Sequence, residues 1–233
     1  MCSGWLAFDA GRHDVADWCY TEALSLATET DDTELGARAL MNLASCCTAR
    51  GDQRQALRLA AAAADRAEHT PPELGLAVMP QLRRATAAAM AGDHAEFTVA
   101  IGRARAALDR QPEATQGNAF LTPAEVDGVA ATGLVTLGTP AEAVGMLRQT
   151  VLAHPARYAR NRALYKVRLA QAHCDLRDTE AALTSANAVI DDLPASVGSA
   201  RVDAEFERLV NQLHSQDAEG ARAVQARYAA GKE

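Results

Sequence analysis

Apolar and small residues recur along the whole chain at helical spacing. In the stretch 13–28, for example, Tyr20 lies four residues after Ala16, and Ala23 and Leu24 follow it at three and four residues, as on one face of an α-helix. Alternation with a period of two, typical of a half-buried strand, persists nowhere long enough to predict one. The pattern therefore predicts an all-α protein. The expected helices span residues 2–10, 13–28, 33–49, 53–67, 72–91, 94–109, 122–137, 140–153, 159–176, 179–192, 198–214 and 217–230.

One local plan recurs at intervals of 40, 41, 46 and 39 residues, starting from Gly11, Gly51, Gly92, Gly138 and Arg177. A periodic helix runs into a short turn, usually with Gly, and a second helix follows that carries a small residue facing the first. Glycine frees the backbone for the left-handed conformation that ends a helix. A helix pair of this kind cannot bury its apolar face alone, so we expect the copies to stack.

The repeat register makes two structural expectations. Gly51 and Gly138 should have positive φ or lie directly at a helix end, because each marks a turn. Ala56, Ala143 and Ala182 should be buried between paired helices, because each small side chain lets the second helix approach the first.

Three Thr-Pro segments mark helix starts independently. Each has the form of an N-cap Thr, a Pro at the first helical position and a capping-box Glu three residues after the Thr. The segments are Thr70 to Glu73, Thr122 to Glu125 and Thr139 to Glu142. One longer irregular connection spans residues 111–121, but no change in composition marks a second domain. We therefore expect residues 1–233 to form a single domain.

These helix pairs resemble the tetratricopeptide repeat, which has a Gly at the turn, small residues on the second helix and often a Pro near the end. The copies with Gly92 and with Arg177 match less well. The resemblance covers roughly residues 1–192. It implies a right-handed α-solenoid of about five helix pairs, with two closing helices after Pro194. The residues that carry it are Gly11, Ala16, Tyr20, Ala23, Gly51, Ala56, Ala63, Gly138, Ala143 and Pro155.

Two segments also resemble the sensor half of bacterial regulators that join a helix-turn-helix domain to such repeats. They are GWLAFDAGRHDVADWCYTEALSLA, residues 4–27, and RALYKVRLAQAHCDLRDTEAA, residues 162–182. Gly11 lies close to Met1, so we expect no counterpart of the DNA-reading domain. What the resemblance implies is the part that senses a ligand or a partner.

Composition and charge narrow the function classes. Hydrophobic residues make up 48% of the chain and aromatics only 4%, which suits thin layers of packed helices. The net charge of -7 disfavours direct contact with nucleic acid, because a generic DNA binder presents a basic face. No signal peptide or membrane span is predicted, so we expect a cytoplasmic protein. The odd number of cysteines, without framework spacing, predicts reduced core thiols and neither disulfides nor structural zinc.

No enzyme motif is recognisable, and no cofactor or metal is predicted. Most histidines, such as His154, are expected in solvent at turns or helix ends, and a ligand or catalytic role at His173 is the minor alternative. The pairs Asp31-Asp32 and Asp191-Asp192 are expected between helices, as caps rather than acid/base groups.

The resemblance places the candidate binding site on the concave face, which the first helix of each pair lines. The mixture is apolar and hydroxylic, and it lacks the Lys and Asn with which such repeats clamp a terminal carboxylate. Met41, Leu82, Gly128 and Val167 occupy those key places. The alternative is that Met41, Met79 and Met90 only fill the core. The candidate residues are Trp5, Phe8, Met41, Ser45, Met79, Leu82, Thr86, Met90, Thr132, Val135 and Gln171.

Two surface features suggest partners. A basic cluster starts one helix and is either a solvated face or a contact for an acidic partner; it comprises Arg157, Arg160, Arg162, Lys166 and Arg168. The apolar edge with Trp5, Leu6 and Phe8 predicts a cover of some kind, for example a second copy in a homodimer. The favoured function is a module that binds a peptide, a small effector or a protein segment. A scaffold or dimerisation subunit and an enzyme with a site in the groove remain alternatives.

Overall fold

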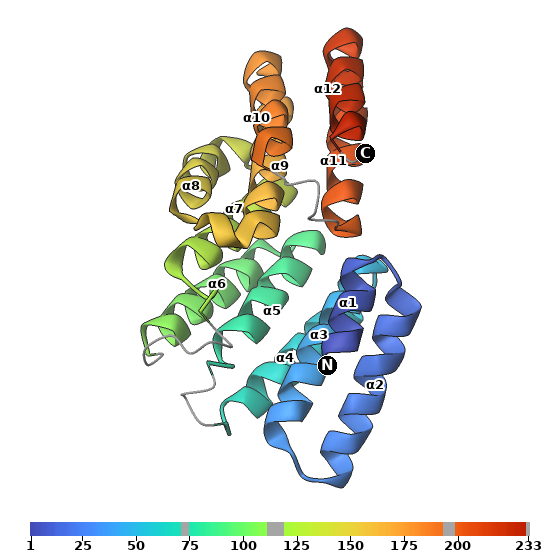
Figure 1. Ribbon diagram of the computed structural model, residues 1–233. Helices are drawn as coiled ribbons and strands as arrows, with labels where there is room; N and C mark the ends of the chain where they lie inside the picture. The colour runs from blue at the N-terminus through green and yellow to red at the C-terminus, as the bar shows by residue number, and fades with distance from the viewer. Residues whose placement is uncertain (71–74, 111–118, 193–198, 232–233) are drawn as a thin grey trace. The chain divides into compact units, whose positions relative to one another are not determined.

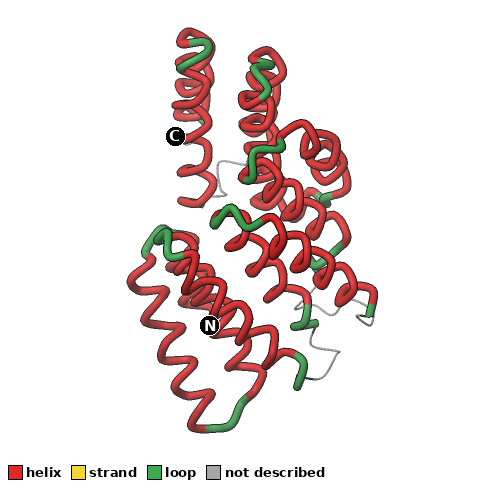
Figure 2. The backbone as a smooth tube through the Cα atoms, turned by 180° about the vertical axis from the view of Figure 1, so that it is seen from behind, coloured by secondary structure: helices red, strands yellow, loops and turns green. Residues whose placement is uncertain are grey.

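A computed structural model describes residues 1–70, 75–110, 119–192 and 199–231. Within these ranges the protein consists of twelve α-helices, a 3-10 turn at Ala156–Tyr158 and connecting loops, with no strand (Figures 1 and 2). Helices that follow one another in sequence pack as antiparallel pairs. The all-α prediction is therefore confirmed.

The helix boundaries agree closely with those predicted from periodicity, except at the start of α5. The helices are α1 (Cys2–Asp9), α2 (His13–Glu29), α3 (Thr33–Ala49), α4 (Gln53–Ala67), α5 (Val78–Met90), α6 (His94–Asp109), α7 (Pro123–Thr136), α8 (Pro140–Ala153), α9 (Ala159–Asp175), α10 (Thr179–Asp192), α11 (Ala200–His214) and α12 (Ala218–Ala230).

The turn glycines have the predicted conformation. Gly51 has φ +81° and Gly138 has φ +82°, and Gly11 and Gly92 are also left-handed. The fifth copy keeps this conformation without a glycine, because Arg177 has φ +61°. A side chain at such a φ is strained by its own Cβ. The predicted left-handed conformation at the turns is therefore confirmed at Gly51 and Gly138, and it is present at Arg177 as well.

An aspartate follows several of these turns and caps the next helix. The side chain of Asp52 accepts a hydrogen bond from the backbone N–H of Gln55 at 2.9 Å, and Asp178 accepts one from Ala181 at 3.1 Å. The same bond forms at Asp32, as predicted. Asp191 and Asp192, however, are the last residues of α10, so the expectation that they lie between helices is wrong.

The Thr-Pro segments behave differently from one another. The hydroxyl oxygen of Thr122 accepts a hydrogen bond from the backbone N–H of Glu125 at 3.3 Å, as expected of an N-cap residue. The Thr139 hydroxyl instead donates to the carbonyl of Leu134 at 3.1 Å, so its predicted capping box is wrong. Thr70 donates to Ala67 in the helix before it. The rest of its segment lies outside the described residues, and the described α5 begins at Val78 rather than at 72.

The chain divides into two compact units, Met1–Gly133 and Leu134–Glu233. In the first unit, α1 to α6 pack in sequence, and α3 also contacts α5. Ala56, which was predicted to be buried, is fully enclosed in this unit together with Ala60 and Ala63 of the same helix. Small side chains therefore bring these helices close together.

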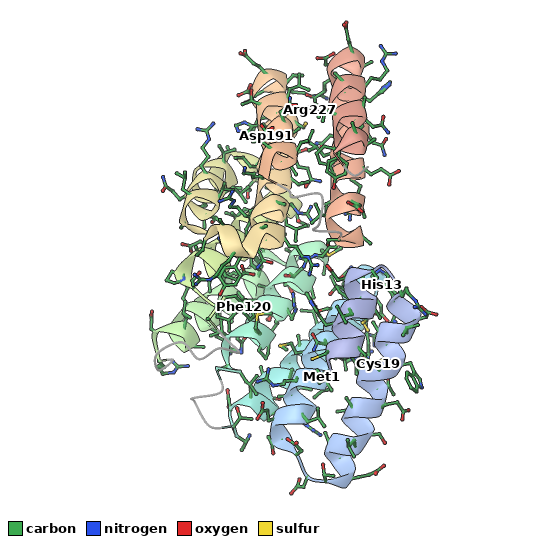
Figure 3. The ribbon with its side chains drawn as sticks, in the orientation of Figure 1. Met1, His13, Cys19, Phe120, Asp191 and Arg227 are labelled. Carbon is green, nitrogen blue, oxygen red and sulfur yellow. The ribbon has the colours of Figure 1, made fainter. Side chains whose placement is uncertain are left out.

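The second unit has one continuous core that α9 to α12 share. Phe206 of α11 is buried among Val167, Val189 and Leu209, and its ring stacks on that of Tyr228 with centroids 3.9 Å apart. Ala143 and Ala182 are fully buried, as predicted. Asp191 of α10 and Arg227 of α12 point toward one another and form an ion pair of 2.5 Å (Figure 3).

In the ranges that the structure describes, no helix has both the length and the apolar character needed to cross a membrane.

Candidate binding face

The candidate face in the first unit is the layer of odd-numbered helices. The core links α1 with α3, because Ala7 packs in one cluster with Leu43 and Cys46. The helix α5 continues this layer through its contact with α3. The predicted groove residues in α1, α3 and α5 therefore belong to helices of one layer (Figure 1).

Two of the predicted groove residues are core residues. Leu82 is 1% exposed, and Met41 packs in a cluster with Leu40 and Ala63. Met79, which is half-buried, packs against the same cluster. For Met41 and Met79 this placement matches the alternative in which methionines fill the core.

The remaining predicted residues of α1, α3 and α5 are accessible to different degrees. Trp5 is 39% and Met90 48% exposed, whereas Phe8, Ser45 and Thr86 are half-buried. The hydroxyls of Ser45 and Thr86 donate to carbonyls one turn back in their own helices. This layer therefore offers aromatic and thioether surface beside hydroxyl groups that retain acceptor capacity.

An aromatic row runs along α1 into the turn after it. The ring centroids of Trp5 and Phe8 are 6.0 Å apart and the two rings are stacked. The rings of Phe8 and His13 form a T-shaped contact with centroids 5.1 Å apart. The sequence placed His13 in a solvated turn, but its ring is half-buried against Phe8, and its Nδ1 is buried without a hydrogen-bond partner among the described residues. Phe8 is thus partly covered by its own chain, whereas Leu6 is 65% exposed.

Tyr20 is the residue of this region that the groove prediction missed. It lies on α2 and is 1% exposed, and its ring passes so close under α1 that a Cβ at Gly4 would lie 2.7 Å from Tyr20 Cε1. Only glycine leaves room for the ring at that point. The Tyr20 hydroxyl is completely buried and has no hydrogen-bond partner in the described part of the chain.

The groups around the Tyr20 hydroxyl are a guanidinium and thiols. Burial, reinforced by Cys46, raises the pKa of Tyr20 above its usual range, while Arg83 of α5 acts in the opposite direction. Burial likewise raises the pKa of the Cys46 thiol to about 11. At neutral pH the phenol and the thiol therefore both keep their protons. The charge of Arg83 and the nearby thiols thus act electrostatically on the Tyr20 oxygen.

Of the other predicted groove residues, Thr132 and Val135 of α7 are half-buried, and Thr132 donates to the carbonyl of Gly128. In the second unit, Gln171 of α9 is 8% exposed, and its Oε1 accepts a bond from Arg168 at 2.9 Å. Arg168 in turn pairs with Glu205 of α11 at 2.5 Å. Gln171 is therefore part of a polar link between α9 and α11.

The basic cluster at the start of α9 does not form a free cationic face. Lys166 donates to the carbonyl of Ala188 at 2.8 Å, and Arg157 lies over the ring of Tyr158. Arg168 is bound to Glu205, and burial lowers its pKa. Arg160 and Arg162 also have interactions within the chain.

Two histidines of the second unit are buried. His154 was expected in solvent, but it is 4% exposed, with Nδ1 3.0 Å from the carbonyl of Thr150 and its ring 5.1 Å from that of Tyr165. His173 is 3% exposed, and burial together with Arg148 lowers its pKa. Asp178 lies 3.8 Å from its Nδ1 but also caps α10.

Three of the thiols are buried, and a cavity in the first unit lies apart from the predicted groove residues. Cys46, Cys47 and Cys174 are buried as predicted, whereas Cys2 is exposed and Cys19 half-buried. In the described ranges no three His, Cys, Asp or Glu side chains are placed to share a metal ion. A cavity of about 370 Å³ in the first unit contains none of the predicted groove residues; it is lined by Ala67, Glu68, Thr70, Gly75, Ala77, Ala107 and Arg110.

No family model matches the chain, and no curated protein matches it.

Proposed function

We propose that the helix pairs form a tetratricopeptide-like, right-handed solenoid and that the protein is a binding module. Its inner face, made by the first helix of each pair, holds a peptide, a small effector or a protein segment. The partly exposed Trp5, Met90, Ser45 and Thr86 supply apolar contact and hydroxyl groups on that face in the first unit.

The observation that carries the proposal is the buried Tyr20 hydroxyl. A buried donor without a partner costs about 1–3 kcal/mol relative to one that is hydrogen-bonded, and such groups in native proteins call for a specific explanation. The hydroxyl lies where α1, α2 and α3 meet, within the influence of Arg83 on α5. An acceptor group of a ligand that reaches this point would recover the missing hydrogen bond.

The test combines ligand screening with a change that removes only the hydroxyl. A thermal-shift screen of the wild type against peptides and metabolites should find compounds that raise the Tm, because a ligand of the native state stabilises it. Tyr20→Phe should raise the Tm of the free protein by roughly 2–4 °C, the equivalent of about 1 kcal/mol. The same substitution should reduce the shift that each of these compounds produces.

Tyr228→Phe is the matched control. The Tyr228 hydroxyl donates to Asp203 at 2.8 Å, so its removal should lower the Tm and leave the ligand shifts unchanged. A wild type whose Tm no compound raises would contradict the binding function. Compounds that keep their full shift in Tyr20→Phe would show that binding takes place away from Tyr20.

A further inference from the structure

The outward face of α2 carries large apolar side chains that the chain itself does not cover. Trp18 is 64% and Leu26 51% exposed. The residues of α2 that are buried, Ala16, Tyr20 and Ala27, lie on the opposite side of the helix and contribute to the core. Trp18 and Leu26 therefore lie on the side of α2 that faces away from the core.

The α4 helix shows that the fold does not require an apolar outward face. It occupies the same place in the next pair and buries Ala56, Ala60 and Ala63 in the same manner. Its exposed positions include Arg54 and Arg58. The α2 helix differs because it presents a tryptophan and a leucine where α4 presents charges. Trp18 and Leu26 therefore offer apolar area on this face to a partner, although carboxylates lie between them.

Carboxylates alternate with the apolar side chains on this face. Positions 14, 18, 22 and 26 follow one another at i, i+4 spacing, so Asp14, Trp18, Glu22 and Leu26 lie along one side of the helix. All four are exposed, as is Glu29 in the last turn. We call the surface formed by these five residues the α2 stripe.

The stripe is acidic and contains no positive charge. The sequence of α2 includes neither Lys nor Arg. The neighbouring Asp17 is bound to Arg50 at 2.9 Å, but the structure shows no ion pair at Asp14, Glu22 or Glu29 within the described residues. Two copies of the stripe facing one another would bring carboxylates against carboxylates, which opposes association. The complementary partner therefore carries positive charge.

We propose that the α2 stripe docks a cationic amphipathic helix of another protein. Apolar side chains of that helix pack on Trp18 and Leu26, and its Lys or Arg side chains pair with Asp14, Glu22 and Glu29. Tryptophan is among the residues that most often dominate binding energy at interfaces. The charge pairs lie at the solvent-exposed rim, so they steer association and make it sensitive to salt. This surface is separate from the inner face proposed above.

A synthetic peptide tests directly whether a cationic amphipathic helix binds the α2 stripe. A fluorescein-labelled peptide with Leu and Lys at amphipathic helical spacing is titrated with the full chain, and binding is measured by fluorescence anisotropy at low and high salt. A control peptide has Glu in place of each Lys. We expect the Lys peptide to bind with an affinity that falls as salt rises, and the Glu peptide not to bind.

Variants of the chain separate the stripe from general acidity. Trp18→Ala should weaken the Lys peptide about tenfold, and Glu22→Lys should weaken it severalfold. Glu142→Lys makes the same charge change on α8, and Leu152→Ala removes another exposed leucine, 78% exposed. Neither control should change the affinity. Circular dichroism confirms that each variant is folded.

Three results would overturn the proposal. The first is no binding of the Lys peptide at low salt. The second is an equal loss of affinity in Glu142→Lys and Glu22→Lys, which would show that only net charge matters. The third is a wild type that sediments as a dimer and becomes a monomer in Trp18→Ala, which would assign the stripe to a second copy of this chain.

Discussion

Phe206 and Trp18 are large aromatic residues in the last and the first helix pair, but Phe206 is 2% exposed and Trp18 64%. In the last pair, α11 and α12, Phe206 stacks on Tyr228, and Tyr228 is fixed by its bond to Asp203. In the first pair, α1 and α2, Trp18 meets solvent together with Leu6. The comparison shows that the last pair covers Phe206 with a second ring, whereas the first pair buries Tyr20 but leaves Trp18 in solvent.

The physical basis of this difference lies in which faces of each pair are covered by other helices. A helix buries its apolar face against the helices that pack on it, so a face that no described helix covers is expected to be polar. The last pair meets this expectation because exposed positions of α12, such as Arg222 and Gln225, are polar. The first pair does not, and six substitutions test how far the comparison holds.

The largest effect is expected in the last pair. Phe206→Ala removes a buried ring from the core that α9 to α12 share, so it should lower the free energy of unfolding by about 3–5 kcal/mol. Urea denaturation followed by circular dichroism measures this loss. A change below about 1 kcal/mol would mean that the stack of Phe206 on Tyr228 does not stabilise the last pair.

The next effect concerns the close contact between Gly4 and Tyr20 in the first pair. Gly4→Ala would place a Cβ 2.7 Å from the Tyr20 ring, and the resulting overpacking should cost about 1–3 kcal/mol. Gly145→Ala is the matched control, because a Cβ at that position of α8 meets nothing within 4 Å. It should raise the free energy of unfolding by about 0.5–1 kcal/mol, the usual gain from replacing a helical glycine. Equal effects of the two substitutions would contradict the packing of Tyr20 against α1.

A smaller gain is expected at the turn between α9 and α10. Arg177→Gly should stabilise the protein by about 1 kcal/mol, because it relieves the strain of a side chain at φ +61°. The reverse change, Gly138→Val, introduces this strain where a Cβ meets no other atom, so it should cost about 1 kcal/mol or more. If the two substitutions shift the melting temperature in the same direction, the left-handed conformation of Arg177 and Gly138 would be contradicted.

The smallest effect on stability is expected at the exposed end. Trp18→Ala should change the free energy of unfolding by no more than about 0.5 kcal/mol, because the exposed Trp18 side chain makes few apolar contacts that truncation would remove. The same urea measurement used for Phe206→Ala makes the comparison direct. A loss of 2 kcal/mol or more, on the order of a core truncation, would show that Trp18 packs against the first pair and stabilises it.

Periodicity and turn chemistry were enough to predict the helices and their pairing. The left-handed Gly51 and Gly138 and the buried Ala56, Ala143 and Ala182 follow from steric rules that act within one turn or one pair. The same rules failed at Thr139, because a hydroxyl that can donate to a nearby carbonyl need not cap the next helix.

The candidate site was less predictable because it depends on tertiary packing. Sequence position alone could not tell that Leu82 is in the core or that Gln171 is bound to Arg168. Tyr20 was assigned to the repeat pattern, and only the structure shows that its hydroxyl lacks a partner. The one available signal was Gly4, since a glycine inside a helical pattern indicates a close approach of another group.

The exposed aromatic residues of the first pair also determine what optical spectroscopy can detect. Trp5 and Trp18 are the two tryptophans of the chain, and both lie in α1 and α2. Intrinsic tryptophan emission therefore reports on this pair alone, and Trp18, 64% exposed, contributes the emission of a largely hydrated indole already in the native state. The ellipticity at 222 nm, by contrast, averages over all the helices. Unfolding curves from the two signals that do not coincide would show directly that the N-terminal pair melts apart from the rest of the protein.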